Sequence, residues 1–280
     1  MGVRIVTDTS CDLSSDLEAE LLASGVQMIP FLFHFGQEAC LDKSMPMSEF
    51  LARATQTWPT TAAPSAGAFV QAFRRVVEAG HQALCLTITG RHSATYNAAV
   101  LAAEEFGPGR VTVLDSRTLS LAQGLLVLAA TRAAQAGASV QEIVARVQDV
   151  HRRTHFYFAL DTLDYLVKGG RAGRLTGLLA SLLRLRPILT LDDGELTLIE
   201  KPRQRSAAKA RLVALAQARL PAETVGIMHV ACADEAAQLA AEMAAVSGLP
   251  LAEIPVAETG AALATHGGPG ALGVVVISRE

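Results

Sequence analysis

Three polar side chains stand in stretches of this sequence where a turn or loop is expected. Thr61 lies in the string TAAPS, Ser93 in GRHSATY and His266 in HGGPG. Two hydroxyls and an imidazole can hydrogen-bond an anionic group, and a serine paired with a histidine can instead act as a nucleophile with its base. Each also has a structural explanation, as a turn residue, a helix cap or a surface histidine. None of the three establishes a function singly.

Ser93 is the residue whose position is best defined by its neighbours. It follows a continuous apolar run, Ala83 to Ile88, which predicts a buried strand. Tyr96 to Phe106 is rich in Ala, Leu and Glu and predicts a helix. A helix N-terminus presents free backbone N–H groups and the positive end of the helix dipole. The loop that holds Ser93 therefore suits an anion.

Two carboxylates follow predicted strands in the same way. Asp8 and Asp115 lie where ligand crevices form in α/β proteins, although capping the next helix explains them better. With Ser93 and His266, either aspartate could complete a serine esterase, which is the alternative function. Against it, the string GRHSA around Ser93 is not a GxSxG elbow and has no glycine two positions before the serine.

A basic, glycine-containing turn suggests a third possibility, a nucleotide or phosphosugar binder. Arg171 and Arg174 lie in the string GGRAGR, and Arg203 lies in a later predicted turn. The string has neither the GxGxxG spacing nor the lysine of a phosphate-binding loop. The phosphate signal is therefore weak, and an ordinary solvated surface explains these arginines equally well.

Composition limits the class of protein. The chain has 280 residues, of which 50% are apolar and 5% aromatic, with a mean hydropathy of +0.31 and a net charge of −3. This charge gives no reason to expect a nucleic-acid partner. Four scattered cysteines without a CxxC pair, and histidines without ligand spacing, predict free thiols and no metal. No apolar run is long enough to span a bilayer, so we expect a cytoplasmic protein with at most transient membrane contact.

The order of elements predicts an α/β protein of two domains. In residues 1–155, strands alternate with helices, which predicts a parallel sheet with helices on both faces. In residues 156–280, the turn Asp192-Asp193-Gly194 between two apolar segments predicts a hairpin, and hence an α/β domain with a mixed sheet.

Several local features carry their own predictions. Ser65 and Ser139 are expected to cap helices, and Ser15 with Glu18 matches a capping box. Residues 58–65 read as an ordered extended loop, and Val26 to Phe33 as a strand interrupted by Pro30. Residues 175–183 read as an apolar helix, 251–256 as a strand and 265–270 as a closing turn.

Six strings in a fixed order resemble the DegV family of bacterial fatty-acid-binding proteins, the lipid-presenting subunits of fatty acid kinase. The strings are TDTSCDL, TAAPS, GRHSATY, LDSRTLSLAQG, LDYLVKGGRAGRLTG and HGGPGALGV. The resemblance covers essentially the whole chain. It implies two α/β domains that hold one long-chain fatty acid in a tunnel between them.

The resemblance also implies residue roles. Thr61, Ser93 and His266 would contact the fatty-acid carboxylate, and a separate kinase would phosphorylate it with ATP bound on its own chain. The positions that could support the site or dock the kinase are Ser65, Arg171, Arg174 and Arg203. The chain itself would be no enzyme and would need no cofactor beyond its lipid ligand. The apolar helix over 175–183 and the Ala-rich helices are candidates for the wall of the tunnel, and an ordinary hydrophobic core is the alternative explanation for them.

The chemistry of such a ligand matches these residue types. A carboxylate removed from water needs several hydrogen-bond donors. Two hydroxyls and an imidazole N–H would hold it without the tight arginine clamp that would hinder phosphorylation. The acyl chain would supply the affinity, at about 0.8 kcal/mol for each buried methylene.

Overall fold

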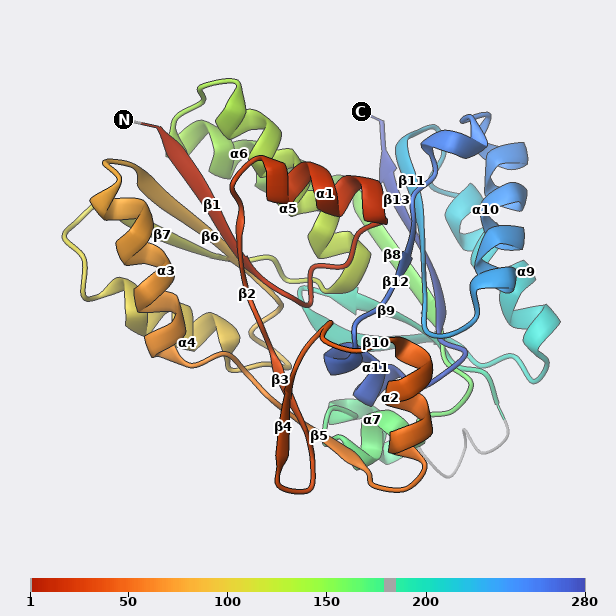
Figure 1. Ribbon diagram of the computed structural model, residues 1–280. Coiled ribbons are helices and arrows are strands. Elements are labelled where there is room, and N and C mark those ends of the chain that lie inside the picture. Colours follow the sequence, from red (N-terminus) through yellow and green to blue (C-terminus); the bar gives the residue numbers. More distant parts are fainter. Residues whose placement is uncertain (1, 179–184, 280) are drawn as a thin grey trace.

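The computed structural model describes residues 2–178 and 185–279, which form layers of helices around two large β-sheets (Figure 1). The first sheet has the order β2-β1-β6-β7, and its neighbouring strands are all parallel. Its strands are β1 (Val3–Asp8), β2 (Gln27–Ile29), β6 (Gln82–Thr87) and β7 (Val111–Asp115). The predicted parallel sheet is thus confirmed.

Helices α3 (Ala66–Glu78) and α4 (Thr95–Ala103) cover one face of the first sheet. Phe69 and Phe73 of α3 are fully buried in this layer. The predicted cap of α3 is confirmed, because the Ser65 hydroxyl accepts a hydrogen bond from the Ala68 N–H at 3.3 Å.

Three helices lie on the opposite face of the first sheet, and the second and third of them also contact strands of the second sheet (Figure 1). These helices are α1 (Ser15–Ala23), α5 (Ser120–Gln135) and α6 (Val140–Arg153). Leu121 and Leu126 of α5 are fully buried, and the same core cluster includes Leu86 of the first sheet and Phe158 of the second. A helix that is apolar on nearly all sides is stable only between two such layers. The predicted Ser139 cap of α6 is a complete capping box with Glu142.

The second sheet has the order β10-β9-β8-β13-β11-β12 and is mixed, with only β11 and β12 parallel among its described neighbours. Its strands are β8 (Thr154–Ala159), β9 (Ile188–Asp192), β10 (Glu195–Glu200), β11 (Ala222–His229), β12 (Val256–Glu258) and β13 (Leu272–Ser278). The hairpin turn is confirmed, since Asp193 and Gly194 both have positive φ. Helices α9 (Arg205–Gln217) and α10 (Ala233–Ser247) cover the outer face.

The sequence did not predict a third, antiparallel sheet of three short strands. These strands are β3 (Leu32–Phe35), β4 (Glu38–Leu41) and β5 (Pro59–Ala62), in the order β4-β3-β5. The expected extended loop over 58–65 is thus partly a strand, because β5 pairs with β3 and aligns Thr61 with Phe33. Helix α2 (Met47–Ala54) packs Phe50 edge-on against Phe33, with ring centroids 5.4 Å apart.

Three further local predictions were wrong. The N-cap of α1 is Ser14, and neither its side chain nor the expected Ser15–Glu18 box caps the helix. The strand expected over 251–256 is instead a 3-10 turn, η2 (Leu251–Glu253), followed by β12, because prolines at 250 and 255 interrupt strand pairing. The first half of the expected closing turn, residues 265–267, is instead the end of an unexpected helix, α11 (Ala261–Gly267), which carries His266.

The remaining elements lie close to α11. Helix α7 (Asp164–Lys168) contacts α11 and is followed by the 3-10 helix η1 (Gly173–Leu178). The apolar helix expected over 175–183 falls largely outside the described residues. The division into domains 1–155 and 156–280 stays a prediction.

A glycine in α5 provides a test of the layered core. A methyl group added at Gly124 would collide with the Asp12 carbonyl oxygen and lie 2.8 Å from the Leu13 side chain. We expect Gly124→Ala to lower the free energy of unfolding by about 1–3 kcal/mol, measured by denaturant titration. Gly67→Ala at an exposed position of α3 is the control, because its methyl would meet nothing closer than 3.8 Å. That change should leave stability equal or raise it by up to about 1 kcal/mol. Equal effects of the two changes would contradict this packing.

Candidate functional site

The three polar side chains singled out in the sequence line one small cavity. Thr61 comes from β5, Ser93 from the loop after β6 and His266 from α11, and the cavity volume is about 60 Å³. The Thr61 hydroxyl and the His266 Nε2 atom lie 2.9 Å apart although 205 positions separate them in the chain. The fold therefore brings together residues from three distant segments.

Helix α11 is held in place by two buried carboxylates from the first part of the chain. Asp12 accepts a hydrogen bond from the Gly260 N–H at 3.1 Å, and Asp42 accepts one from the Ala262 N–H at 3.0 Å. Both N–H groups belong to the start of α11, where they have no partner inside the helix. These carboxylates fix the position of His266 without touching it. Sequence reasoning missed both, although Asp12 lies in the string TDTSCDL.

The Ser93 loop is tied to the second sheet. The His92 Nε2 atom accepts a hydrogen bond from the Leu196 N–H of β10 at 3.1 Å. Ser93 itself lies 2.8 Å from the Thr95 hydroxyl and accepts a hydrogen bond from the Thr95 N–H. Its oxygen thus has a defined position in the cavity wall beside the N-terminus of α4.

His266 is a neutral imidazole at physiological pH. Burial, followed by the positive charge of Arg171 and the proximity of His92, lowers its pKa to about 4. Its Nδ1 atom is buried and has no hydrogen-bond partner among the described residues. Gly169 packs against this edge of the ring, where any side chain would collide with Nδ1. The ring can therefore offer one N–H or one lone pair to a ligand, depending on its tautomer.

Arg171 adds a positive charge to the cavity. It lines the same wall as Thr61 and His266, and its guanidinium donates to the Gly169 carbonyl at 2.7 Å. Arg171 is one of the positions that the sequence analysis named as supporting the site or docking a partner, whereas a tight arginine clamp on the carboxylate was not expected. The structure places two hydroxyls, a neutral imidazole and Arg171 around the same cavity, and together these groups can donate hydrogen bonds to a carboxylate.

A second, apolar cavity of about 70 Å³ adjoins the first. The two cavities share His266 and four leucines, which are Leu119, Leu166, Leu196 and Leu263. Beyond these, the apolar cavity continues along β8 past Leu160, Phe158 and Phe156. A polar pocket that continues into an apolar one suits a ligand with an anionic head and a hydrocarbon tail.

The other candidate residues do not line the polar cavity as the structure describes it. Ser65 caps α3, and Arg203 is exposed in the segment between β10 and α9. The side chain of Arg174 lies outside the described part of the chain. Among residues 2–178 and 185–279, no group of three or more His, Cys, Asp or Glu side chains is arranged to hold a metal ion.

The arrangement does not support a serine hydrolase. Within residues 2–178 and 185–279, the hydrogen bonds of Ser93 go to Thr95, and His266 bonds Thr61. The expected acidic members have structural roles, because Asp8 accepts from the Ile88 N–H and Asp115 accepts from the Gly90 N–H. A nucleophilic serine needs a base within hydrogen-bond reach.

The described residues, 2–178 and 185–279, contain no helix with the length and apolarity needed to cross a bilayer.

The lowered pKa of His266 makes a prediction about pH. The folded value of about 4 lies below the ordinary 6.5, so the fold favours the neutral ring. Its contribution to stability is complete above pH 6.5 and is lost as the pH falls toward 4, on the order of 3 kcal/mol. We expect an NMR titration of the His266 ring to have its midpoint near pH 4. His266→Gln should weaken the loss of stability over this range, and a midpoint near 6.5 would contradict the buried, neutral ring.

Comparisons with known proteins agree with the family resemblance of the sequence motifs. The family model described as "Uncharacterised protein, DegV family" matches residues 2–279. A DegV domain-containing protein of Streptomyces coelicolor is 36% identical over 283 residues, covering 99% of both chains. A Thermus thermophilus structure, described as fatty acid binding of a DegV family protein, has a TM-score of 0.90 at 32% identity, covering 100% of both chains. The fatty acid binding protein DegV of Bacillus subtilis has a TM-score of 0.87 at 26% identity, again covering 100% of both. The chain therefore belongs to the DegV family.

Proposed function

We propose that this protein binds a long-chain fatty acid, with the carboxylate among Thr61, Ser93 and His266 and the tail in the apolar cavity. The observation that carries the proposal is the Thr61–His266 pair in a polar cavity that adjoins an apolar cavity lined by leucine and phenylalanine. The fatty-acid-binding descriptions of the Thermus and Bacillus relatives support the same ligand class. The site would lie between the two predicted domains, because its walls come from both large sheets.

The energetics favour an amphipathic ligand over a small anion. A carboxylate leaving water loses its hydration, which the hydroxyls, the imidazole and the Arg171 guanidinium offset through hydrogen bonds. A long acyl chain contributes on the order of 10 kcal/mol of gross transfer free energy. Association and ordering costs consume part of this. Binding therefore depends on the tail, and the polar residues fix its orientation.

We infer further that the bound acid is presented to a separate ATP-dependent fatty acid kinase, so that this chain acts in the cytoplasm as a carrier and not as an enzyme. The family resemblance is the main support. The charge of Arg171 beside the carboxylate site would help to stabilise the developing charge of phosphoryl transfer. Arg203, exposed in the segment before α9, and Arg174 are the proposed contacts for the kinase.

Two adjacent threonines of β5 allow a matched test of the carboxylate site. Thr61 lines the cavity, whereas Thr60 is exposed on the other face of the strand. We expect Thr61→Val to weaken oleate binding about ten-fold or more, because a hydrogen bond to a charged group contributes about 1.5–3 kcal/mol. Thr60→Val should leave it unchanged. Displacement of a fluorescent fatty acid from delipidated protein measures both, and equal effects would argue against the site.

The carrier role has its own test. The delipidated protein, loaded with oleate, is mixed with ATP and a bacterial fatty acid kinase, and acyl phosphate is trapped as the hydroxamate by hydroxylamine. We expect hydroxamate only when both proteins are present, and several-fold less with His266→Ala because the carboxylate is held less firmly. Hydroxamate formed without the kinase, or none with it, would overturn the carrier role while leaving lipid binding intact.

A further inference from the structure

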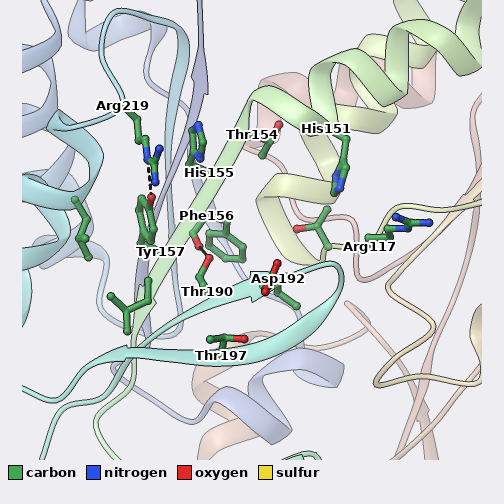
Figure 2. A pocket seen from close by; sticks show the side chains of 14 residues that line it. Arg117, His151, Thr154, His155, Phe156, Tyr157, Thr190, Asp192, Thr197 and Arg219 are labelled. Carbon is green, nitrogen blue, oxygen red and sulfur yellow. Dashed lines mark hydrogen bonds between the residues drawn. The ribbon is translucent and has the colours of Figure 1, made fainter.

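An outer pocket of about 390 Å³ lies between β8 and the β9–β10 hairpin (Figure 2). One side of this pocket is the start of β8, with Thr154, His155, Phe156 and Tyr157. Thr190, Asp192 and Thr197 of the β9–β10 hairpin form the opposite side in the same view. None of the proposed carboxylate residues lines this pocket.

Phe156 is the one described residue that lines both the apolar cavity and the outer pocket. The residue is only 4% exposed, and its ring lies 4.9 Å from that of Phe158, centroid to centroid. Gly273 of β13 leaves room for it, since a Cβ there would come within 3.0 Å of the Phe156 ring. The ring is therefore a fixed partition between the two spaces.

The partition stands at the end of the cavity that is remote from the polar site. Leu160, Phe158 and Phe156 occupy alternate positions of one chain segment and line the same cavity. Alternate residues of a strand are about 6.8 Å apart, so Phe156 lies roughly 13 Å beyond Leu160. An acyl chain that enters beside His266 and follows this row meets Phe156 last.

The strand pairing explains why open space begins immediately behind the ring. The pairing of β8 with β9 includes only Tyr157, Phe158 and Ala159 of β8. At Phe156 the two strands separate, and the Thr190 hydroxyl, instead of a backbone N–H, donates to the Phe156 carbonyl at 2.8 Å. Leu191, Ile199 and Leu215 supply apolar surface in the space beyond.

We propose that Phe156 is the end wall of the acyl site and sets the longest chain that fits. The inference rests on the proposed fatty-acid function. Removal of the ring joins the apolar cavity to the outer pocket, so that the methyl end of a longer chain passes between β8 and β9 and contacts the apolar residues there.

The test compares palmitate, stearate, arachidate and behenate as competitors of a fluorescent fatty acid on the full-length protein. Phe156→Ala should raise the affinity for behenate relative to palmitate at least ten-fold, because two or more additional methylenes become buried. Phe156→Leu is expected to fold more readily and to shift the same ratio in the same direction by a smaller factor. Thermal melting verifies that each variant is folded.

Phe158→Ala is the matched control, because Phe158 is also buried and lines the apolar cavity but does not reach the outer pocket. It should lower the affinity for all four acids and leave their ratio within about three-fold. If the affinity ratio of behenate to palmitate is unchanged in both Phe156 variants, or shifts equally in Phe158→Ala, Phe156 is not the end wall of the acyl site. If the unaltered protein binds none of the four acids, the proposed function itself fails.

Discussion

Two buried carboxylates, Asp12 and Asp42, hold the N-terminus of the helix that carries His266, and the site depends on them. Burying a carboxylate is costly unless several donors satisfy it. Asp12 receives hydrogen bonds from the Gly260 N–H and from the Ser120 hydroxyl at 2.7 Å, with the Lys43 ammonium 3.9 Å away. Burial nevertheless outweighs these contacts and raises the Asp12 pKa to about 7. The fold includes this unfavourable burial of the Asp12 carboxylate because Asp12, near the N-terminus, fixes α11, near the C-terminus.

The layered architecture explains why the cavities lie where they do. Helix α5 fills the space between the two large sheets, and its N-terminal neighbour Leu119 lines both the polar and the apolar cavity. Beyond the start of this helix, the polar cavity is lined by residues of α11, of β5 in the third sheet and of the loop after β6. The side chains of several short segments leave gaps between them, whereas the side chains of the single helix α5 fill the space between the sheets. Space for a ligand therefore opens at the end of the central helical layer.

In this site, the groups that give hydrogen-bond direction are different from the group that supplies positive charge, whereas an arginine clamp on the carboxylate would provide both. Thr61, Ser93 and the neutral His266 ring are directional but uncharged groups, whereas Arg171 supplies charge from the side of the same cavity. Burial and the positive charge of Arg171 both oppose protonation of His266. The ring therefore stays neutral when the pH changes slightly around neutrality. Such a site can orient a carboxylate while most of the binding free energy comes from the tail.

The sequence by itself determined the features that depend on near neighbours in the chain. The parallel β1–β6–β7 core, the caps at Ser65 and Ser139 and the hairpin at Asp193-Gly194 all follow from local patterns of apolarity, hydroxyls and glycine. The order of six motif strings was enough to identify the family and to name the three polar residues that meet in the cavity.

Only the tertiary structure decided what depends on contacts between distant segments. The seven residues of α11 are too few to form a stable helix alone, and they are helical here because Asp12 and Asp42 bind their first N–H groups. Strand β5 likewise exists through its pairing with β3. The entry of Arg171 into the cavity and the place of Phe156 at its end have the same origin, because no local pattern encodes which remote side chains will pack together.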